Sequence, residues 1–191
     1  MEKIVTRSEK DFKNRRNQLI IGAVLIGLMV FSTLGYALGN AGDEESESVQ
    51  FGPVEFNRDN TGYWNFNIDG FDFFTLYNPE EVGDINFFNQ QSLQKYNGKP
   101  LYFVGGFQEP NIELSRNLNS FVLRFNEACL DDECDGDFPV KNCSEDNVII
   151  FEEVEGSGSI TQEENCVFIK SDLGNQTRYA DAYLFKLLGI K

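Results

Sequence analysis

Apolar positions along the chain form one long unbroken run, followed by short segments of two different periods. The run covers residues 19–38, where Tyr36 is the only ionisable side chain. A helix of about 20 residues, rising about 1.5 Å per residue, crosses the roughly 30 Å hydrocarbon core of a bilayer. The pattern therefore predicts a transmembrane helix over residues 19–38.

Strict alternation after this run predicts a β-hairpin. Trp64, Phe66 and Ile68 alternate with Asn65 and Asn67, Asp69-Gly70 then suits a type I′ turn, and the alternation continues through Phe71, Phe73 and Thr75. One face of the hairpin is therefore rich in aromatic side chains and must be buried against another layer of the fold. The pairs expected in this register are Ile68 with Phe71 and Phe66 with Phe73.

Short apolar runs and helical periodicity alternate through the rest of the chain. The predicted strands are one around Val54 and Phe56, and others over residues 101–104, 148–151 and 166–169. Three helices are predicted. The first is short, is capped by Asn78 and runs from Pro79 through Ile85. The second has an apolar stripe of Leu114, Leu118, Phe121, Val122, Phe125 and Ala128, and the last has a stripe of Ala180, Tyr183, Leu184, Leu187 and Leu188 and is capped by Gly189. This mixture predicts an α+β fold, in which the N-terminal transmembrane helix precedes one extracytoplasmic domain with a mixed sheet of roughly three to six strands and helices packed on one face.

Charge differs between the two sides of the apolar run. Residues 1–18 contain six basic and three acidic side chains, whereas the rest of the chain contains 10 basic and 28 acidic ones. Basic residues flank the cytoplasmic side of membrane helices. The predicted order is a basic cytoplasmic tail (1–18), the transmembrane helix (19–38), an acidic linker (39–50) and an extracytoplasmic domain (51–191) of a single-pass cell-membrane protein.

A cleaved signal peptide is the alternative interpretation of the apolar run, because Ala37-Leu38-Gly39 fits a small-residue cleavage site. The apolar core of a signal peptide is typically about 7–15 residues long. This run is longer and follows an extended basic tail, so the anchor is favoured.

Composition excludes several kinds of chemistry. The chain contains no histidine, which removes the usual general base and the commonest zinc ligand, so Ser-His-Asp, Cys-His and His-zinc sites are excluded. The net charge of −15 repels phosphate backbones, so no nucleic-acid partner is expected. No phosphate-binding glycine loop follows a strand, and no cofactor is predicted.

The four cysteines, Cys129, Cys134, Cys143 and Cys166, all lie on the side predicted to be oxidising, so two structural disulfides are expected. We favour Cys129 with Cys134 and Cys143 with Cys166, because the first pair ties a helix end to its own loop and the second ties two segments that flank strands. A redox-active dithiol is disfavoured, since the Cys-x-x-Cys spacing is missing and the neighbours are acidic.

Acidic residues crowd the loop after Cys129. Asp131, Glu133, Asp135 and Asp137 supply oxygen ligands of the kind that Ca²⁺ prefers. Their spacing matches the start of an EF-hand loop, but the twelfth position is Asn142 instead of glutamate. A solvated acidic loop is favoured over a calcium site.

Two sequons, Asn142-Cys143-Ser144 and Asn175-Gln176-Thr177, are candidate glycosylation sites. Asn175 is the better candidate, because it precedes a helix and is expected to be exposed, whereas Asn142 lies beside a predicted disulfide.

Four motifs stand out in the predicted domain: WNFNIDG at 64–70, LYNPEEV at 76–82, NCVFI at 165–169 and DAYLFKLLGI at 181–190. Together they resemble motifs of a group of single-pass envelope proteins from small-genome archaea. This resemblance implies a single-pass membrane topology, and it implies no activity, cofactor or catalytic residue.

The function predicted from these observations is a membrane-tethered, non-enzymatic interaction or structural module of the cell envelope, with an envelope protein or a glycan as its partner. Tyr63, Phe74 and Leu76 fall on the second face of the hairpin, which is either covered by another layer or open to a partner. The alternatives are an ectoenzyme that uses carboxylates, for example on glycans, and a calcium-dependent surface protein.

Overall fold

The apolar run lies on one long helix, α1 (Arg7–Gly39). In this computed structural model of the chain, the described residues are 7–39, 47–88, 92–105, 109–130 and 136–191. The stretch Arg15–Thr33 is long and apolar enough to cross a membrane, with a mean hydropathy of 1.4. By length and composition α1 fits a membrane span or a signal sequence.

The chain divides into two compact units, Met1–Glu45 and Ser46–Lys191. The second unit, called the domain below, begins with a strand at Ser48. Folded structure therefore starts inside the stretch that was predicted to be linker. The reason is backbone pairing with the next strand, which the mixed polar pattern of these residues does not reveal.

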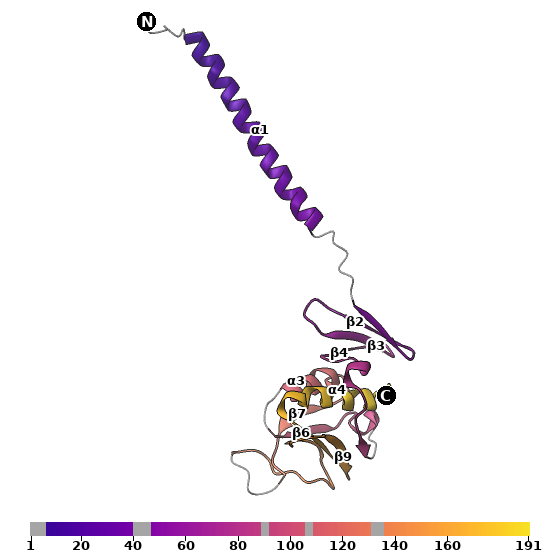
Figure 1. Cartoon of the computed structure of the whole chain (residues 1–191). Coiled ribbons are helices and arrows are strands. Elements are labelled where there is room, and N and C mark those ends of the chain that lie inside the picture. Colours follow the sequence, from indigo (N-terminus) through magenta and orange to yellow (C-terminus); the bar gives the residue numbers. More distant parts are fainter. Residues whose placement is uncertain (1–6, 40–46, 89–91, 106–108, 131–135) are drawn as a thin grey trace. The chain divides into compact units, whose positions relative to one another are not determined.

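The domain is α+β, as predicted (Figure 1). Its strands are β1 (Ser48–Phe51), β2 (Val54–Arg58), β3 (Trp64–Ile68), β4 (Phe71–Thr75), β5 (Phe87–Phe88), β6 (Pro100–Val104), β7 (Arg124–Glu127), β8 (Asn147–Glu153), β9 (Ser159–Glu163) and β10 (Cys166–Ser171). Its helices are α2 (Pro79–Val82), α3 (Glu109–Leu118) and α4 (Gln176–Leu187), with short 3-10 turns at η1 (Leu93–Lys95) and η2 (Leu173–Asn175).

The strands form two sheets, whereas one sheet was predicted. The first four strands pair in chain order into an antiparallel sheet, and the other six form a mixed sheet in the order β5-β9-β10-β8-β6-β7. Within the mixed sheet β9 and β10 are antiparallel and the other neighbours are parallel. The prediction was wrong because alternation shows which face of a strand is buried but not which sheet the strand joins.

Helices α3 and α4 lie between the two sheets (Figure 1). The inner faces of both sheets and the two helices share one core, which includes the fully buried side chains of Trp64, Leu114, Ile149 and Leu184. A second, smaller cluster around Val148 covers the other face of the mixed sheet. Both faces of the mixed sheet are therefore covered.

The β3–β4 hairpin forms in the predicted register, with Phe66 opposite Phe73. Asp69 and Gly70 adopt the left-handed backbone angles that a type I′ turn requires, with φ values of 52° and 85°. Local chemistry therefore determines this part of the fold.

Two helix ends also form as predicted. The Asn78 side chain accepts the N–H groups of the first turn of α2, and the Glu81 side chain accepts the Asn78 N–H, which is a capping box. α2 ends at Val82, however, and does not extend to Ile85. Gly189 follows α4 with φ of 71°, and the last turn closes in a Schellman pattern.

The predicted helix with the stripe from Leu114 to Ala128 was wrong in its second half. α3 ends at Leu118, and Phe125 lies on β7, which pairs in parallel with β6. Apolar spacings of three and four residues continue across the turn by coincidence, and the pairing with β6 outweighs them. The Phe125 ring then stacks on Phe103, with ring centroids 6.0 Å apart.

Candidate functional site

The four-stranded sheet has one buried face and one open face. Alternation places four aromatic side chains on the buried face, and each is 4% exposed or less: Phe56, Trp64, Phe66 and Phe73. The open face carries amides and carboxylates from Glu55, Asn57, Asn65, Asn67 and Asp72. Phe74 joins them on this face and is 38% exposed.

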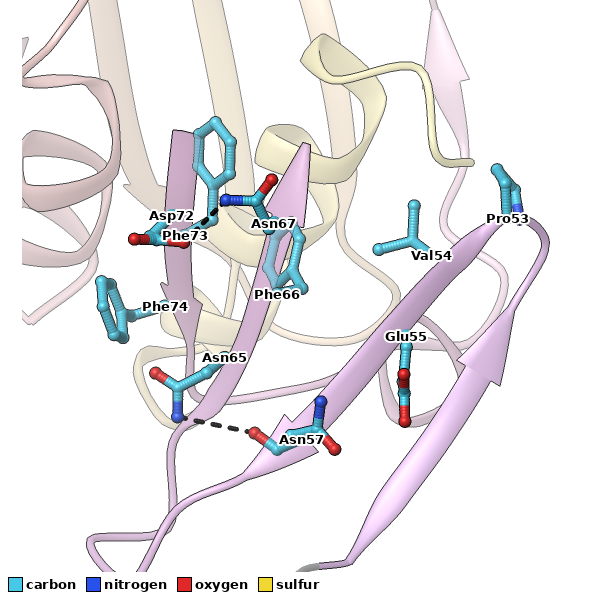
Figure 2. Close-up of a pocket in the computed structure, with 10 residues that line it drawn as sticks. All are labelled: Pro53, Val54, Glu55, Asn57, Asn65, Phe66, Asn67, Asp72, Phe73 and Phe74. Carbon is cyan, nitrogen blue, oxygen red and sulfur yellow. Dashed lines mark hydrogen bonds between the residues drawn. The ribbon is translucent and has the colours of Figure 1, made fainter. Parts of the chain in front are cut away.

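Strands β2 and β3 pair at one end and then separate. Their ladder contains the pairs Asn57 with Asn65 and Arg58 with Trp64. Continued pairing would put Glu55 opposite Asn67, but the strands diverge there, as Figure 2 shows. Strand alternation directs the main-chain N–H and C=O groups of these two residues toward the gap.

The divergence leaves a hollow of about 530 Å³, called the sheet hollow below (Figure 2). This volume lies within the roughly 300–1,000 Å³ that small-ligand pockets occupy. Apolar side chains border the hollow beside the polar ones. Its lining residues are Pro53, Val54, Glu55, Asn57, Asn65, Phe66, Asn67, Asp72, Phe73 and Phe74.

Several polar groups in the sheet hollow have unused hydrogen-bonding capacity. The Asn57 side chain and the Glu55 carboxylate make no hydrogen bond within the part of the chain that the structure describes. Asn67 Nδ2 donates to Asp72 Oδ1 at 2.7 Å, which leaves Asp72 Oδ2 open. Asn65 donates through Nδ2, and its Oδ1 remains available. The hollow thus offers several acceptors and a smaller number of donors.

The turn between β2 and β3 holds the closed end of the sheet hollow. Asp59 Oδ1 accepts hydrogen bonds from Thr61 N at 2.9 Å, Thr61 Oγ1 at 2.6 Å and Tyr63 N at 3.0 Å. Asp59 Oδ2 accepts one from Asn65 Nδ2 at 3.1 Å. The hydrogen bonds from Thr61 and Asn65 lower the pKa of Asp59 to about 2, so this carboxylate is ionised at neutral pH.

Side chains of α3 close the free edge of β4. Asn117 Oδ1 accepts the Phe74 N–H at 2.8 Å, and Asn117 Nδ2 donates to the Phe74 carbonyl at 2.7 Å. Glu113 Oε1 accepts the Leu76 N–H at 3.0 Å. These groups replace a neighbouring strand, so this edge of the sheet is protected from strand addition.

Arg116 of α3 covers part of the second aromatic face of the hairpin. Its guanidinium lies 4.5 Å from the centre of the Tyr63 ring and 5.9 Å from that of Phe74. Arg116 also forms an ion pair with Glu113 at 2.7 Å. The face predicted to be either covered or open is therefore partly covered, and Phe74 remains accessible beside the sheet hollow.

Two acidic side chains meet in the core beneath the same sheet. Asp181 Oδ2 accepts the Tyr77 N–H at 3.0 Å, next to the Leu76 N–H that Glu113 accepts. Burial, and then the charge of Glu113, raises the pKa of Asp181 well above its usual range, and burial also raises the pKa of Glu113. Asp181 is fully buried and Glu113 nearly so, so this pair is structural.

One of the two predicted disulfides is confirmed. Cys143 and Cys166 are bonded, with Cα atoms 5.0 Å apart. The bridge links the segment before β8 to the start of β10, so it lies against the cluster on the outer face of the mixed sheet. The other predicted bridge joins Cys129 to Cys134, and Cys134 lies outside the described residues.

Most of the predicted calcium ligands, Asp131, Glu133 and Asp135, also lie outside the described residues. Asp137 is described and is exposed. Within the described ranges, no group of three or more metal-ligating side chains comes together. The calcium site stays a prediction.

The two sequon asparagines differ from expectation in their exposure. Asn142 is exposed, and its Oδ1 accepts hydrogen bonds from the following turn. Asn175 begins α4 as predicted but is half-buried, and its Nδ2 donates to Asp172 at 2.8 Å. Exposure therefore favours Asn142, because glycosylation needs an accessible amide nitrogen.

No protein family, curated protein or solved structure was found to match the chain.

The sheet hollow was not predicted from sequence. One signal was present, because Asn57, Asn65 and Asn67 each occupy an outward position directly after a buried aromatic residue. Asparagine is depleted in strands, so three of them on one sheet face mark it as unusual. The divergence of β2 from β3, however, has no local signature.

Proposed function

We propose that this chain is a membrane-tethered, non-enzymatic binding module of the cell envelope, with α1 as the anchor and the domain outside the cytoplasm. The apolar helix with basic residues before it and acidic residues after it supports this orientation. The Cys143–Cys166 disulfide also supports it, because such bonds persist in oxidising compartments.

The sheet hollow is the observation that carries the binding role. Strands that lie side by side in a stable sheet normally continue their ladder. Here the ladder stops while both strands continue, and the open space is lined by solvent-accessible amide and carboxylate groups with unused hydrogen-bonding capacity beside Phe74. A ligand that displaces water from this space meets both polar groups and an aromatic ring.

Labelling of introduced cysteines in intact cells tests the orientation. Ser157 is exposed in the turn between β8 and β9, and Ser8 lies in the basic tail. A membrane-impermeant maleimide is expected to label Ser157→Cys in intact cells and Ser8→Cys only after lysis. The reverse result, or labelling of both positions only after lysis, would overturn the proposed orientation.

Photocrosslinking in intact cells tests the binding role. A benzophenone amino acid replaces Phe74 at the sheet hollow, and as a matched control it replaces Phe88, an exposed phenylalanine on β5. Discrete crosslinked products are expected from position 74 and not from position 88. Equal products from both positions, or none from position 74, would contradict a binding role for this face.

A carboxylate enzyme that acts on glycans is the second candidate, because Glu55 and Asp72 both line the sheet hollow. Glycoside hydrolysis needs two carboxyl groups across the substrate. Release of reducing sugar by the full chain, lost in both Glu55→Gln and Asp72→Asn, would favour the enzyme over the binding module.

A further inference from the structure

We propose that the sheet hollow binds an uncharged glycan, through the amides of Asn57 and Asn65, the carboxylates of Glu55 and Asp72, and the ring of Phe74. This inference deepens the proposed function and depends on it, since it names the ligand class of the same site.

The hydrogen-bonding groups of the sheet hollow match a sugar. A sugar hydroxyl both donates and accepts, and it fits a site where carboxylate and amide oxygens lie beside amide donors. The hollow supplies this combination through the Asn57 side chain, the Glu55 carboxylate and the open oxygens of Asn65 and Asp72. The main-chain N–H groups at the divergence of β2 and β3 add donors to a set that is rich in acceptors.

Phe74 provides the apolar surface that the C–H face of a pyranose ring needs. It is 38% exposed on the same sheet face, and Figure 2 shows it beside Asn65 and Asp72. Arg116 fixes one side of this ring from α3, with its guanidinium 5.9 Å from the ring centre. A preorganised aromatic ring next to fixed polar groups is the usual composition of a small-ligand site.

The charge of the sheet hollow selects against acidic glycans. Its described lining includes two carboxylates, Glu55 and Asp72, and no basic side chain. The chain as a whole carries a net charge of −15. Uronic acids and phosphorylated sugars are therefore repelled, whereas neutral sugars meet only hydrogen-bonding groups.

The geometry disfavours an extended peptide. A peptide that adds as a strand needs several consecutive main-chain partners. The gap between β2 and β3 exposes the main chain of one opposed pair, Glu55 and Asn67, and the free edge of β4 is closed by Asn117 and Glu113. A compact polyhydroxyl ligand fits this short opening better.

Binding of defined oligosaccharides to the full chain in lipid nanodiscs tests the inference. The probes are mannotetraose and maltotetraose as neutral glycans, tetragalacturonate as an acidic glycan, and tetralysine as a basic peptide. Calorimetry or saturation-transfer NMR is expected to show at least one neutral glycan binding with Kd of about 1 mM or tighter, a range typical of a few hydrogen bonds. Tetragalacturonate is expected to bind at least about tenfold more weakly, and any charge-driven binding of tetralysine to this acidic chain should not compete with the neutral glycan.

Matched variants locate the binding. Asn57→Ala and Phe74→Ala are each expected to weaken neutral-glycan binding by about three- to tenfold, since each removes about one interaction with the ligand. The controls Asn126→Ala and Phe88→Ala remove an exposed asparagine and an exposed phenylalanine from strands β7 and β5 of the other sheet, and they should leave binding within about twofold. Thermal unfolding of each variant confirms that the fold is retained.

The inference is overturned if no neutral glycan binds, if the variants at Asn57 and Phe74 bind as well as the controls, if tetragalacturonate binds more tightly, or if tetralysine displaces the neutral glycan. Crosslinking from position 74 in intact cells combined with no glycan binding would overturn the glycan inference and leave the binding module standing. Labelling of position 157 only after lysis, together with no crosslinked product from position 74, would overturn the proposed binding module itself.

Discussion

The two sheets of the domain differ in how completely they are closed. In the mixed sheet, β8 has a parallel partner on each side, both faces are covered, and the Cys143–Cys166 bridge secures the outer cluster. In the four-stranded sheet, β3 and β4 pair over five residues, but the ladder between β2 and β3 contains two pairs. Its outer face is polar and carries the sheet hollow.

This difference separates structural from binding roles within one domain. Strands that are paired on both sides and covered on both faces, as β8 is, have no free groups to offer a partner, and their burial contributes to stability. A sheet that buries one aromatic face can leave its other face uncovered, because packing of the buried face against the core already stabilises the sheet. On the buried face of the same two strands, the rings of Phe56, Phe66 and Phe185 pack together, with the Phe56 and Phe66 centroids 4.4 Å apart.

The largest expected effect is a loss of unfolding free energy when a side chain is removed from the buried face of the four-stranded sheet, compared with its open face. Phe66→Ala removes a ring that contacts Phe56, Phe73 and Phe185, and it should lower the free energy of unfolding by about 3–5 kcal/mol. Asn57→Ala on the open face should change it by no more than about 0.5 kcal/mol. Urea unfolding of the full chain, followed by Trp64 fluorescence, measures both values. Equal losses would show that the open face is part of the core.

Removal of the confirmed disulfide tests the closure of the mixed sheet. The double variant Cys143→Ala/Cys166→Ala should lose about 2–4 kcal/mol of unfolding free energy, because the unfolded chain regains the freedom that the bridge removes. Ser157→Ala in an exposed turn is the control and should stay near wild type. An unchanged melting temperature in the double variant would contradict a structural role for the bridge.

The next prediction concerns the free edge of β4, which Asn117 protects. Asn117→Ala leaves the N–H and C=O groups of Phe74 without their side-chain partners, at a cost of about 1–3 kcal/mol. It also exposes a strand edge, so concentration-dependent self-association is expected by sedimentation. Asn119→Ala changes an exposed asparagine just beyond α3 and serves as the control. A monomeric and fully stable Asn117→Ala protein would show that the edge needs no protection.

The smallest expected effect is the pH dependence of the buried acid pair. The pKa of Asp181 in the folded state is raised above its unfolded value, so the folded state binds more protons than the unfolded state between the two values. Stability is therefore greater at acidic pH and is lost as pH rises through the folded-state pKa. The chain contains no histidine, so few other side chains titrate between about pH 5 and 8.

Melting temperatures of the full chain at pH 5 and pH 8 measure this effect. Wild type should be more stable at pH 5, and Asp181→Asn should reduce the difference, because asparagine keeps an acceptor for the Tyr77 N–H without a charge. Glu109→Gln, an exposed acid at the start of α3, should retain the wild-type difference. Greater wild-type stability at pH 8 would contradict the raised pKa.

The sequence by itself determined the features whose causes lie within a few residues. The Asp69-Gly70 turn set the register of the hairpin, and the Asn78 capping box and Gly189 set two helix ends. The apolar stretch on α1 and the Cys143–Cys166 pairing also followed from the order of residues. In each case the interacting groups are neighbours in the chain or belong to a small set of possible pairs.

Only the tertiary structure decided how these parts combine. The division into two sheets, the end of α3 at Leu118 and the strand at Phe125 depend on which strands meet, and that choice is made by packing between distant segments. The sheet hollow lies where the ladder between β2 and β3 stops at the pair Asn57–Asn65, and the next residues of the two strands, Phe56 and Phe66, pack against Phe185 of α4 on the buried face. Its polar groups can be read from the sequence, but their convergence is a product of that long-range packing.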